Sequence, residues 1–139
     1  MTNFNQRAKS LITSIAPDLF SEVIEKEYKG RTYIDFIIKN DNKELILTTD
    51  YDEYSVFFTT FHTHFTPDTE DEEKEMLEEA LTYIKEIITE KIIIASYYDR
   101  DNLSTCTYIT PEEEPKRHEG KKLVLESWKD TYSQIFEAE

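Results

Sequence analysis

Hydrophobic and polar residues alternate most clearly in the middle of the chain, over the run EYSVFFTTFHTHF from Glu53 to Phe65. Tyr, Phe, Val and Thr dominate this run, and their bulky or branched side chains suit a pleated strand better than a helix. The run predicts one central strand, in which a period of two places His62 and His64 on the same side. One face is expected to carry Phe57, Thr59, Phe61, Thr63 and Phe65, and the other Val56, Phe58, Thr60, His62 and His64.

Shorter β-rich runs precede this strand and predict an antiparallel meander. Residues 32–39 and 44–49 are rich in branched residues, and Asn40-Asp41-Asn42 between them favours a tight turn. Residues 21–28 fit either a helix or a strand, and we favour the strand. Residues 50–52 turn the chain into the central run, so that short connections join four consecutive strands.

Helical spacing of apolar residues predicts one helix before this meander and one after it. The first runs from Phe4 to Ala16 and is followed by a proline. The second starts where Asp68 or Thr69 can cap it and continues to about Thr89, with acidic first turns that suit the positive end of the helix dipole. Its apolar stripe, which should pack on one face of the sheet, consists of Leu77, Ala80, Leu81, Ile84 and Ile88.

The last part of the chain predicts more strands. Residues 91–98 and 103–110 are β-rich and flank Asp99-Arg100-Asp101-Asn102, a strong turn signal. Residues 110–120 contain two prolines and mixed charges, which indicates an exposed loop. Residues 122–128 resume as a strand.

The final residues, 128–136, fit two structures. Their aromatic and aliphatic residues have helical spacing, whereas Lys129-Asp130 suits the turn of a hairpin, and we favour the hairpin. All these elements together predict a single α+β domain over residues 1–139. We expect a largely antiparallel sheet of six to eight strands, with an N-terminal helix and one long acidic amphipathic helix packed on the sheet.

Length and composition limit the class of protein. At 139 residues, 38% of them hydrophobic, the chain can bury the core of one domain. Its single cysteine, Cys106, cannot form an intramolecular disulfide, and no apolar run is long enough to span a bilayer. No signal-peptide pattern opens the sequence, so we expect a cytoplasmic protein.

Charge narrows the range of partners. The chain has 16 basic and 30 acidic residues, a formal net charge of −14, which disfavours nucleic acids and anionic membranes as partners. Residues 68–79 (DTEDEEKEMLEE) hold eight carboxylates and one lysine, and so carry half of this net charge. Both a solvated helix face and a docking surface for a basic protein explain this block.

His62 and His64 are the candidate metal ligands. Two imidazoles on one side of a strand can hold zinc or iron when a carboxylate and water complete the shell. The alternative is a structural pair or part of a binding surface, since no HExxH motif or cysteine pair completes a ligand set. With two glycines, the chain also lacks a P-loop and a GxGxxG motif. We therefore expect no catalytic residue and no cofactor.

The order of these elements resembles small bacterial immunity proteins that accompany polymorphic toxins. The resemblance is carried by EYSVFFTTFHTHF, by the helix over residues 77–88, and by Ser127, Trp128 and Tyr132. It implies a non-enzymatic antitoxin that binds and neutralises a cognate toxin domain, with a basic toxin surface facing the acidic block. The residues expected to bind this protein partner are Glu70, Asp71, Glu72, Glu73, Glu75 and Trp128.

Two other functions are compatible with the sequence. One is a small metal-binding protein or metal-dependent hydrolase that uses His62 and His64. The other is an accessory domain that dimerises through an exposed sheet edge. The sequence leaves the oligomeric state open.

Overall fold

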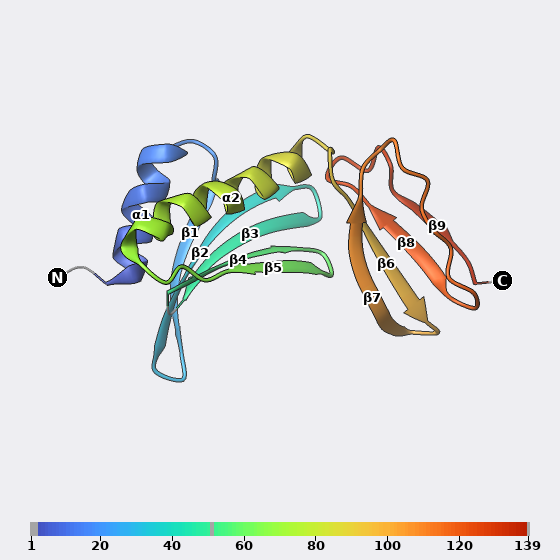
Figure 1. Cartoon of the computed structure of the whole chain (residues 1–139), viewed down its shortest axis with the longest axis horizontal. Coiled ribbons are helices and arrows are strands. Elements are labelled where there is room, and N and C mark those ends of the chain that lie inside the picture. Colours follow the sequence, from blue (N-terminus) through green and yellow to red (C-terminus); the bar gives the residue numbers. More distant parts are fainter. Residues whose placement is uncertain (1–2, 51, 139) are drawn as a thin grey trace. The chain divides into compact units, whose positions relative to one another are not determined.

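The computed structural model describes residues 3–50 and 52–138, within which two helices and nine strands form an α+β fold (Figure 1). The strands form two antiparallel sheets, one in the order β1-β2-β3-β4-β5 and the other in the order β7-β6-β8-β9. In chain order the elements are α1 (Phe4–Ile15), β1 (Glu22–Tyr28), β2 (Arg31–Asn40), β3 (Lys43–Asp50), β4 (Glu53–Phe58), β5 (Phe61–Phe65), α2 (Glu70–Ile88), β6 (Ile93–Asp99), β7 (Asn102–Ile109), β8 (Lys122–Glu126) and β9 (Gln134–Phe136).

The predicted α+β class is confirmed, but the expectation of one sheet with six to eight strands is wrong. The hairpins β2–β3 and β6–β7 form as predicted, and residues 21–28 contain a strand, β1. In the part of the chain that the structure describes, no strand of the first sheet pairs with a strand of the second. Periodicity predicts individual strands, whereas the division into sheets depends on pairing between segments far apart in the sequence.

Contacts divide the chain into two compact units. The first consists of Met1–Phe58 and His62–Ile84, and the second of Thr59–Phe61 and Lys85–Glu139. The five-stranded sheet belongs to the first unit except for Phe61 of β5, and the four-stranded sheet belongs to the second. A single domain over residues 1–139 stays a prediction.

A capping box starts α1. Asn3 Oδ1 accepts a hydrogen bond from the N–H of Gln6 at 2.9 Å, and Gln6 Oε1 accepts one from the N–H of Asn3 at 3.2 Å. Phe4, Ala8 and Ile12 form the buried stripe of this helix. The predicted helix is confirmed and ends one residue earlier than expected.

Both ends of α2 have identifiable caps. At its start, Thr69 Oγ1 accepts a hydrogen bond from the N–H of Glu72 at 3.3 Å. After its end, Glu90 adopts a left-handed φ of 58°, and the N–H of Lys91 donates to the carbonyl of Glu86 at 2.8 Å. The buried stripe is Leu77, Ala80, Leu81, Ile84 and Ile87, so Ile87 takes the place predicted for Ile88.

The core of the first unit lies between its helices and one face of its sheet (Figure 1). Phe4 of α1 packs on Tyr54 with ring centroids 5.0 Å apart, and Tyr83 of α2 packs on Phe65 at 5.9 Å. Strand register aligns the buried residues of β2, β3 and β4 on this face. They are Ile34, Phe36, Leu45, Leu47, Tyr54, Val56 and Phe58.

The run from Glu53 to Phe65 is a hairpin, so the prediction of one central strand is wrong. The chain turns at Thr59 and Thr60, and Thr59 has a φ of 52°. Reversal of the chain within two residues changes which residues share a face, because opposite positions of a hairpin point to the same side. His62 and His64 therefore lie beside Phe57, on the face opposite the helices.

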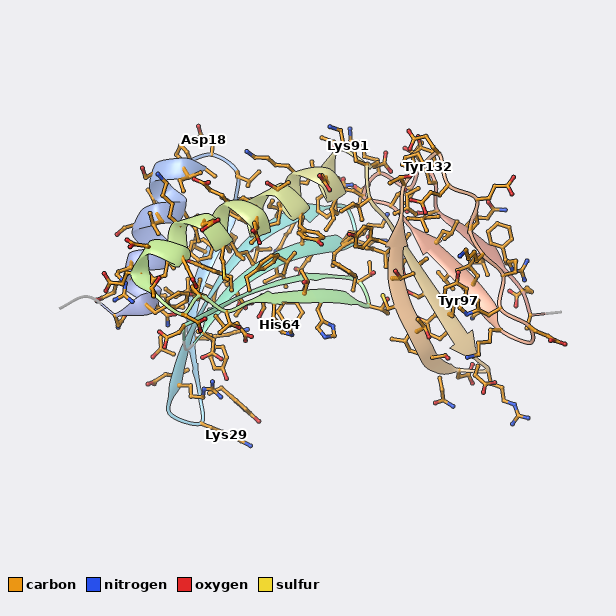
Figure 2. All side chains as sticks on the ribbon, in the orientation of Figure 1. Asp18, Lys29, His64, Lys91, Tyr97 and Tyr132 are labelled. Carbon is orange, nitrogen blue, oxygen red and sulfur yellow. The ribbon has the colours of Figure 1, made fainter. Side chains whose placement is uncertain are left out.

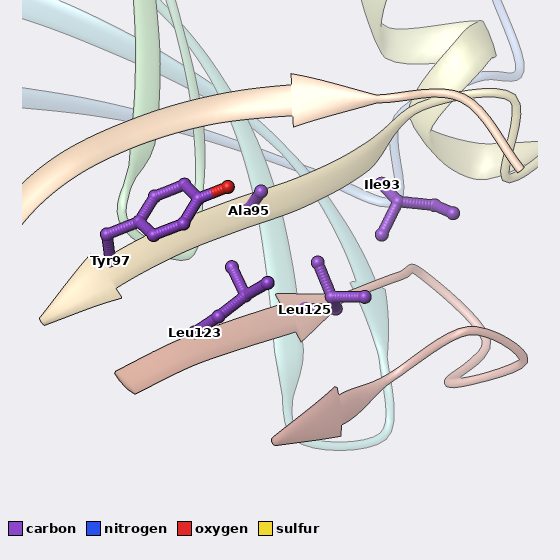
Figure 3. Packing of buried hydrophobic residues seen from close by; sticks show 5 residues of the cluster. All are labelled: Ile93, Ala95, Tyr97, Leu123 and Leu125. Carbon is purple, nitrogen blue, oxygen red and sulfur yellow. The ribbon is translucent and has the colours of Figure 1, made fainter. Parts of the chain in front are cut away.

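The second unit has a small apolar core on one face of its sheet. Figure 3 shows the cluster formed by residues of β6 and β8. The loop that follows β7 packs here: Tyr97 Oη donates to the carbonyl of Lys116 at 2.5 Å, and the Tyr97 ring stacks on His118 with centroids 3.8 Å apart. The cluster consists of Ile93, Ala95, Tyr97, Leu123 and Leu125, with Ile109 and Phe136 packed against it.

The predicted C-terminal hairpin is confirmed. Strand β9 pairs with β8 in antiparallel register, with Leu123 opposite Phe136. The turn between them contains Asp130, whose φ of 62° is left-handed. Asn and Asp tolerate this conformation better than most residues, which allows the turn to form without glycine.

Among the described residues, no helix is long and apolar enough to cross a membrane.

Candidate functional site

The start of α2 presents carboxylates to solvent. The side chain of Glu70 is 75% exposed, and Asp71 and Glu75 are exposed as well. Glu72 is half-buried, because its carboxylate accepts a hydrogen bond from the N–H of Asp68 at 2.8 Å. These four predicted partner-binding residues therefore lie at the surface or at its margin.

Glu73, also predicted to face a partner, instead joins the two helices. It is 5% exposed, and its carboxylate accepts two hydrogen bonds from Arg7, one from Nε at 3.0 Å and one from Nη2 at 2.9 Å. Such a bidentate pair fixes both side chains. Glu73 lies four residues before Leu77 on the apolar stripe of α2, so helical spacing contained the signal for its burial.

Residues far from α2 in the sequence extend the acidic surface. The pKa of Arg7 is raised, mainly by its hydrogen bond to Glu73 and also by the charges of Glu73, Glu70 and Asp52, so all three carboxylates act on one guanidinium. Glu53 is near the start of α2, because it accepts a hydrogen bond at 3.2 Å from Thr66, just before α2. We call this surface the acidic end, and it comprises Asp52, Glu53, Asp68, Glu70, Asp71, Glu72 and Glu75.

Asp50 lies next to the acidic end and pairs with Arg31 at 3.2 Å. The pKa of Asp50 is raised, mainly because burial disfavours its charged form. The guanidinium of Arg31 opposes this shift, and the charge of Glu53 adds a smaller upward contribution.

Trp128 does not provide an exposed aromatic anchor, in contrast to the prediction. It is 5% exposed, in the turn after β8. Glu90 holds this turn: it accepts hydrogen bonds from the N–H of Lys129 at 3.1 Å and from Thr131 Oγ1 at 2.6 Å. The aromatic residue and its neighbours therefore stabilise the second unit.

The two histidines lie together on the first sheet, as HxH spacing in a strand predicts. Their ring centroids are 5.3 Å apart, and His62 stacks on Phe57 at 6.1 Å. Nδ1 of His64 is 2.7 Å from Ser55 Oγ and 3.7 Å from a Glu53 carboxylate oxygen. Over residues 3–50 and 52–138, no group of three or more His, Cys, Asp or Glu side chains is arranged to hold a metal ion.

The histidines border the uncovered face of the five-stranded sheet. Figure 2 shows His64 projecting from the side of the sheet opposite the helices. A groove of about 520 Å³ lies on this face, and at its floor Asp35 accepts hydrogen bonds from Lys26 at 2.5 Å and Thr48 at 2.8 Å. Lys26, Asp35 and Thr48 are thus paired with one another. The groove is lined by Lys26, Glu27, Tyr28, Tyr33, Asp35, Ile46, Thr48 and Phe57.

No protein-family model, curated protein or solved structure matches this chain.

The acidic end differs from the groove and the histidine pair in one chemical respect. The acidic end carries exposed carboxylates, Glu70, Asp71 and Glu75, with one exposed lysine, Lys74, among them, and the nearby Arg7 already pairs with Glu73. Sequence reasoning found the α2 part of this surface. It missed Asp52 and Glu53, because their approach to α2 depends on the tertiary fold.

Proposed function

We propose that this chain is a non-enzymatic immunity protein that binds and neutralises a basic bacterial toxin domain, and that the acidic end is its contact surface. The observation that carries the proposal is the gathering of exposed carboxylates from α2 and from the β3–β4 turn at one place. The proposal needs no catalytic group on this chain, because inhibition requires only that the toxin surface be covered.

Electrostatics supports this function. With a net charge of −14, the chain attracts a positively charged protein over a distance, and a concentrated acidic surface orients the encounter. Surface charges of this kind act mainly on the association rate and lose their effect as salt increases. A toxin that acts on nucleic acid has a basic cleft, which complements the acidic end.

The test needs a candidate toxin domain, which is to be sought among the genes next to this one and purified with its active site disabled. Glu70, Asp71, Glu72 and Glu75 are replaced together by Ser, and Glu73 is kept so that its pair with Arg7 persists. We expect association to slow by roughly tenfold or more at low salt and the dissociation constant to rise by a similar factor. The difference between variant and wild type should shrink at high salt.

A matched control removes the same charge from another part of the surface. Glu112, Glu114, Glu119 and Glu137 are exposed residues of the second unit, and their replacement by Ser changes the net charge equally. We expect this control to lower the association rate much less. Equal effects of the two variants would show that only net charge matters, and unchanged binding of the first variant would refute the proposed surface.

A further inference from the structure

The acidic end continues, through Glu53, onto the face of the five-stranded sheet that the helices leave uncovered. Glu53 Oε1 accepts a hydrogen bond from Thr66 at 3.2 Å and lies 3.7 Å from Nδ1 of His64. The ring centroid of His64 lies 6.3 Å from that of Phe57 and 5.3 Å from that of His62. Glu53 therefore belongs both to the acidic end and to the margin of three adjoining rings, Phe57, His62 and His64, which we call the aromatic cluster.

Contacts within the protein fix the aromatic cluster but leave much of it exposed. Ser55 Oγ lies 2.7 Å from Nδ1 of His64, and His62 stacks on Phe57 at 6.1 Å. Phe57 is nevertheless 38% exposed, the side chain of His64 is 46% exposed, and His62 is exposed as well. Because the rings already hold each other in place, a partner that covers them restricts little further side-chain motion.

The proposed function needs a contact of this kind in addition to the acidic end. Exposed carboxylates act chiefly on the rate of association. Slow dissociation depends on a few aromatic or arginine side chains near the centre of an interface. Trp128, the aromatic residue that the sequence suggested for this role, is buried. The aromatic cluster is exposed and adjoins the acidic end, so it can supply the missing contact.

Charge and shape indicate which group of a partner fits here. Both contacts of Glu53 involve Oε1, and within residues 3–50 and 52–138 no hydrogen bond reaches its Oε2. Arginine suits a carboxylate beside aromatic rings, because its planar guanidinium pairs with the carboxylate and stacks on a ring. Two cations of the same face, Lys26 and Arg31, already pair with Asp35 and Asp50. A net charge of −14 disfavours an anionic group.

We propose that the aromatic cluster and Glu53 bind an arginine side chain of the basic partner. The guanidinium pairs with Glu53 and stacks on the ring of His64, and the aliphatic stem of the arginine lies against Phe57. This inference rests on the proposed function, because it takes the partner to be a basic protein. The two contact regions have different roles: the acidic end speeds association, and the aromatic cluster slows dissociation.

Two peptides of equal charge, hexa-arginine and hexa-lysine, test the site without a toxin. Carboxylates alone attract both equally, whereas stacking on the cluster should make wild-type protein bind hexa-arginine about two- to fivefold more tightly. Fluorescence anisotropy of labelled peptides measures this preference at a fixed salt concentration. Phe57→Ala and Glu53→Gln should each remove most of it. Tyr132→Ala, which truncates an aromatic residue of the second unit that is 40% exposed, should keep it. Equal binding of both peptides to wild type, or an unchanged preference in Phe57→Ala, would overturn the proposal.

Chemical modification of histidine locates the peptide on wild-type protein, so it does not depend on any variant that might unfold. Diethyl pyrocarbonate modifies accessible imidazoles, and mass spectrometry assigns the modified residue. Hexa-arginine should slow modification of His64 severalfold. His118, an exposed histidine of the second unit, is the internal control and should react at the same rate with and without peptide. Undiminished modification of His64 in the presence of saturating peptide would refute the site.

A toxin domain separates this inference from the proposed function. Phe57→Ala should raise the dissociation rate roughly tenfold and change the association rate little. Replacement of the four α2 carboxylates by Ser should do the reverse. If the α2 variant slows association but Phe57→Ala leaves dissociation unchanged, the arginine site is wrong and the acidic contact surface stands. If the α2 variant has no effect, the acidic contact surface is wrong.

Discussion

The two sheets of this protein are covered by different kinds of structure. Helices α1 and α2 cover one face of the five-stranded sheet, where Tyr54 and Phe58 are fully buried. The apolar face of the four-stranded sheet is instead packed by an irregular loop that contributes Pro111, Pro115 and His118. The comparison indicates that the first unit is stabilised mainly by apolar packing, and that the second depends more on particular polar contacts.

The polar contacts of the second unit fix its irregular segments. Tyr97 holds the long loop through the carbonyl of Lys116, and Glu90 holds the β8–β9 turn through Lys129 and Thr131. Hydrogen bonds of this kind fix the position of a segment that lacks the regular backbone hydrogen bonds of a helix or strand. If this difference holds, truncation of an apolar residue should lower the free energy of unfolding more in the first unit than in the second. Loss of a polar anchor should destabilise the second unit.

The largest effect is expected from truncation of the helix-covered core. Phe58→Ala should lower the free energy of unfolding by about 3–5 kcal/mol, because helices and sheet cannot collapse into the cavity. Leu125→Ala, under the loop, should cost about 2–3 kcal/mol, since a loop adjusts more easily. Urea unfolding followed by circular dichroism measures both, and the fluorescence of Trp128 reports on the second unit. A larger cost for Leu125→Ala would contradict the comparison.

The second effect concerns Glu90, which is 8% exposed. Glu90→Ala should cost about 2–3 kcal/mol, because it leaves the N–H groups of Lys129 and Thr131 without their acceptor. Glu90 also has a left-handed φ of 58°, so Glu90→Gly should cost about 1 kcal/mol less than Glu90→Ala. Glu119→Ala, in the exposed loop, is the control and should change stability little. Equal costs at positions 90 and 119 would show that the turn needs no anchor.

Glu90 also predicts a pH dependence. Burial opposes its ionisation, but hydrogen bonds from Thr131, Ser127 and the backbone outweigh burial and lower the pKa of Glu90 below its ordinary value of 4.5. The unfolded chain therefore binds this proton more readily, and the stabilisation is present above the unfolded pKa and lost as pH falls through the folded pKa. Glu90→Gln should remove this part of the acid sensitivity, measured as unfolding free energy against pH. An unaltered pH profile would assign the sensitivity to other carboxylates.

A smaller effect is expected for the ion pair between the helices. Glu73→Gln should cost about 1–2 kcal/mol, since it removes the charge from a buried bidentate contact whose partner, Arg7, is partly solvated. Glu70→Gln removes a carboxylate that is 75% exposed and 3.6 Å from the same guanidinium, and should cost about 0.5 kcal/mol or less. Thermal unfolding of both variants measures the difference. Similar values would mean that burial of Glu73 has little energetic importance.

Local signals predicted much of the fold. Asn40-Asp41-Asn42 and residues 99–102 are turn sequences, and both hairpins form where these residues lie. The stripes of α1 and α2 identified the helices for the same reason, because 3.6-residue spacing is a local property. The turn at Thr59 and Thr60 has no Gly, Asn, Asp or Pro, and the flanking strands continue the same aromatic pattern. Nothing local in the sequence distinguished this hairpin from one strand.

The candidate site was predictable in part for a related reason. The acidic residues of α2 are close together in the sequence, so the sequence alone predicted Glu70, Asp71 and Glu75 as partner-binding residues. Asp52 reaches the same surface only through the β-sheet, which no local pattern encodes. Trp128 was predicted as a contact residue from its chemical type, and type alone does not decide whether an aromatic residue is buried.

The last prediction concerns Thr59, in the turn between β4 and β5 that the sequence did not reveal. It is the only substitution here that is expected to raise the free energy of unfolding. Thr59 is a β-branched residue held at a φ of 52°, a conformation that costs an L-residue about 1–2 kcal/mol and that glycine adopts freely. Thr59→Gly removes this cost but increases the freedom of the unfolded chain, which offsets about 0.4–1 kcal/mol. The net result should be stabilisation by about 0.5–1 kcal/mol in urea unfolding.

Thr60 is the matched control, because it is not among the residues of positive φ. Its hydroxyl is 2.6 Å from Ser96 Oγ, so Thr60→Gly loses this contact and should destabilise the protein. If both variants destabilise, the flanking strands and not the turn determine where the chain reverses.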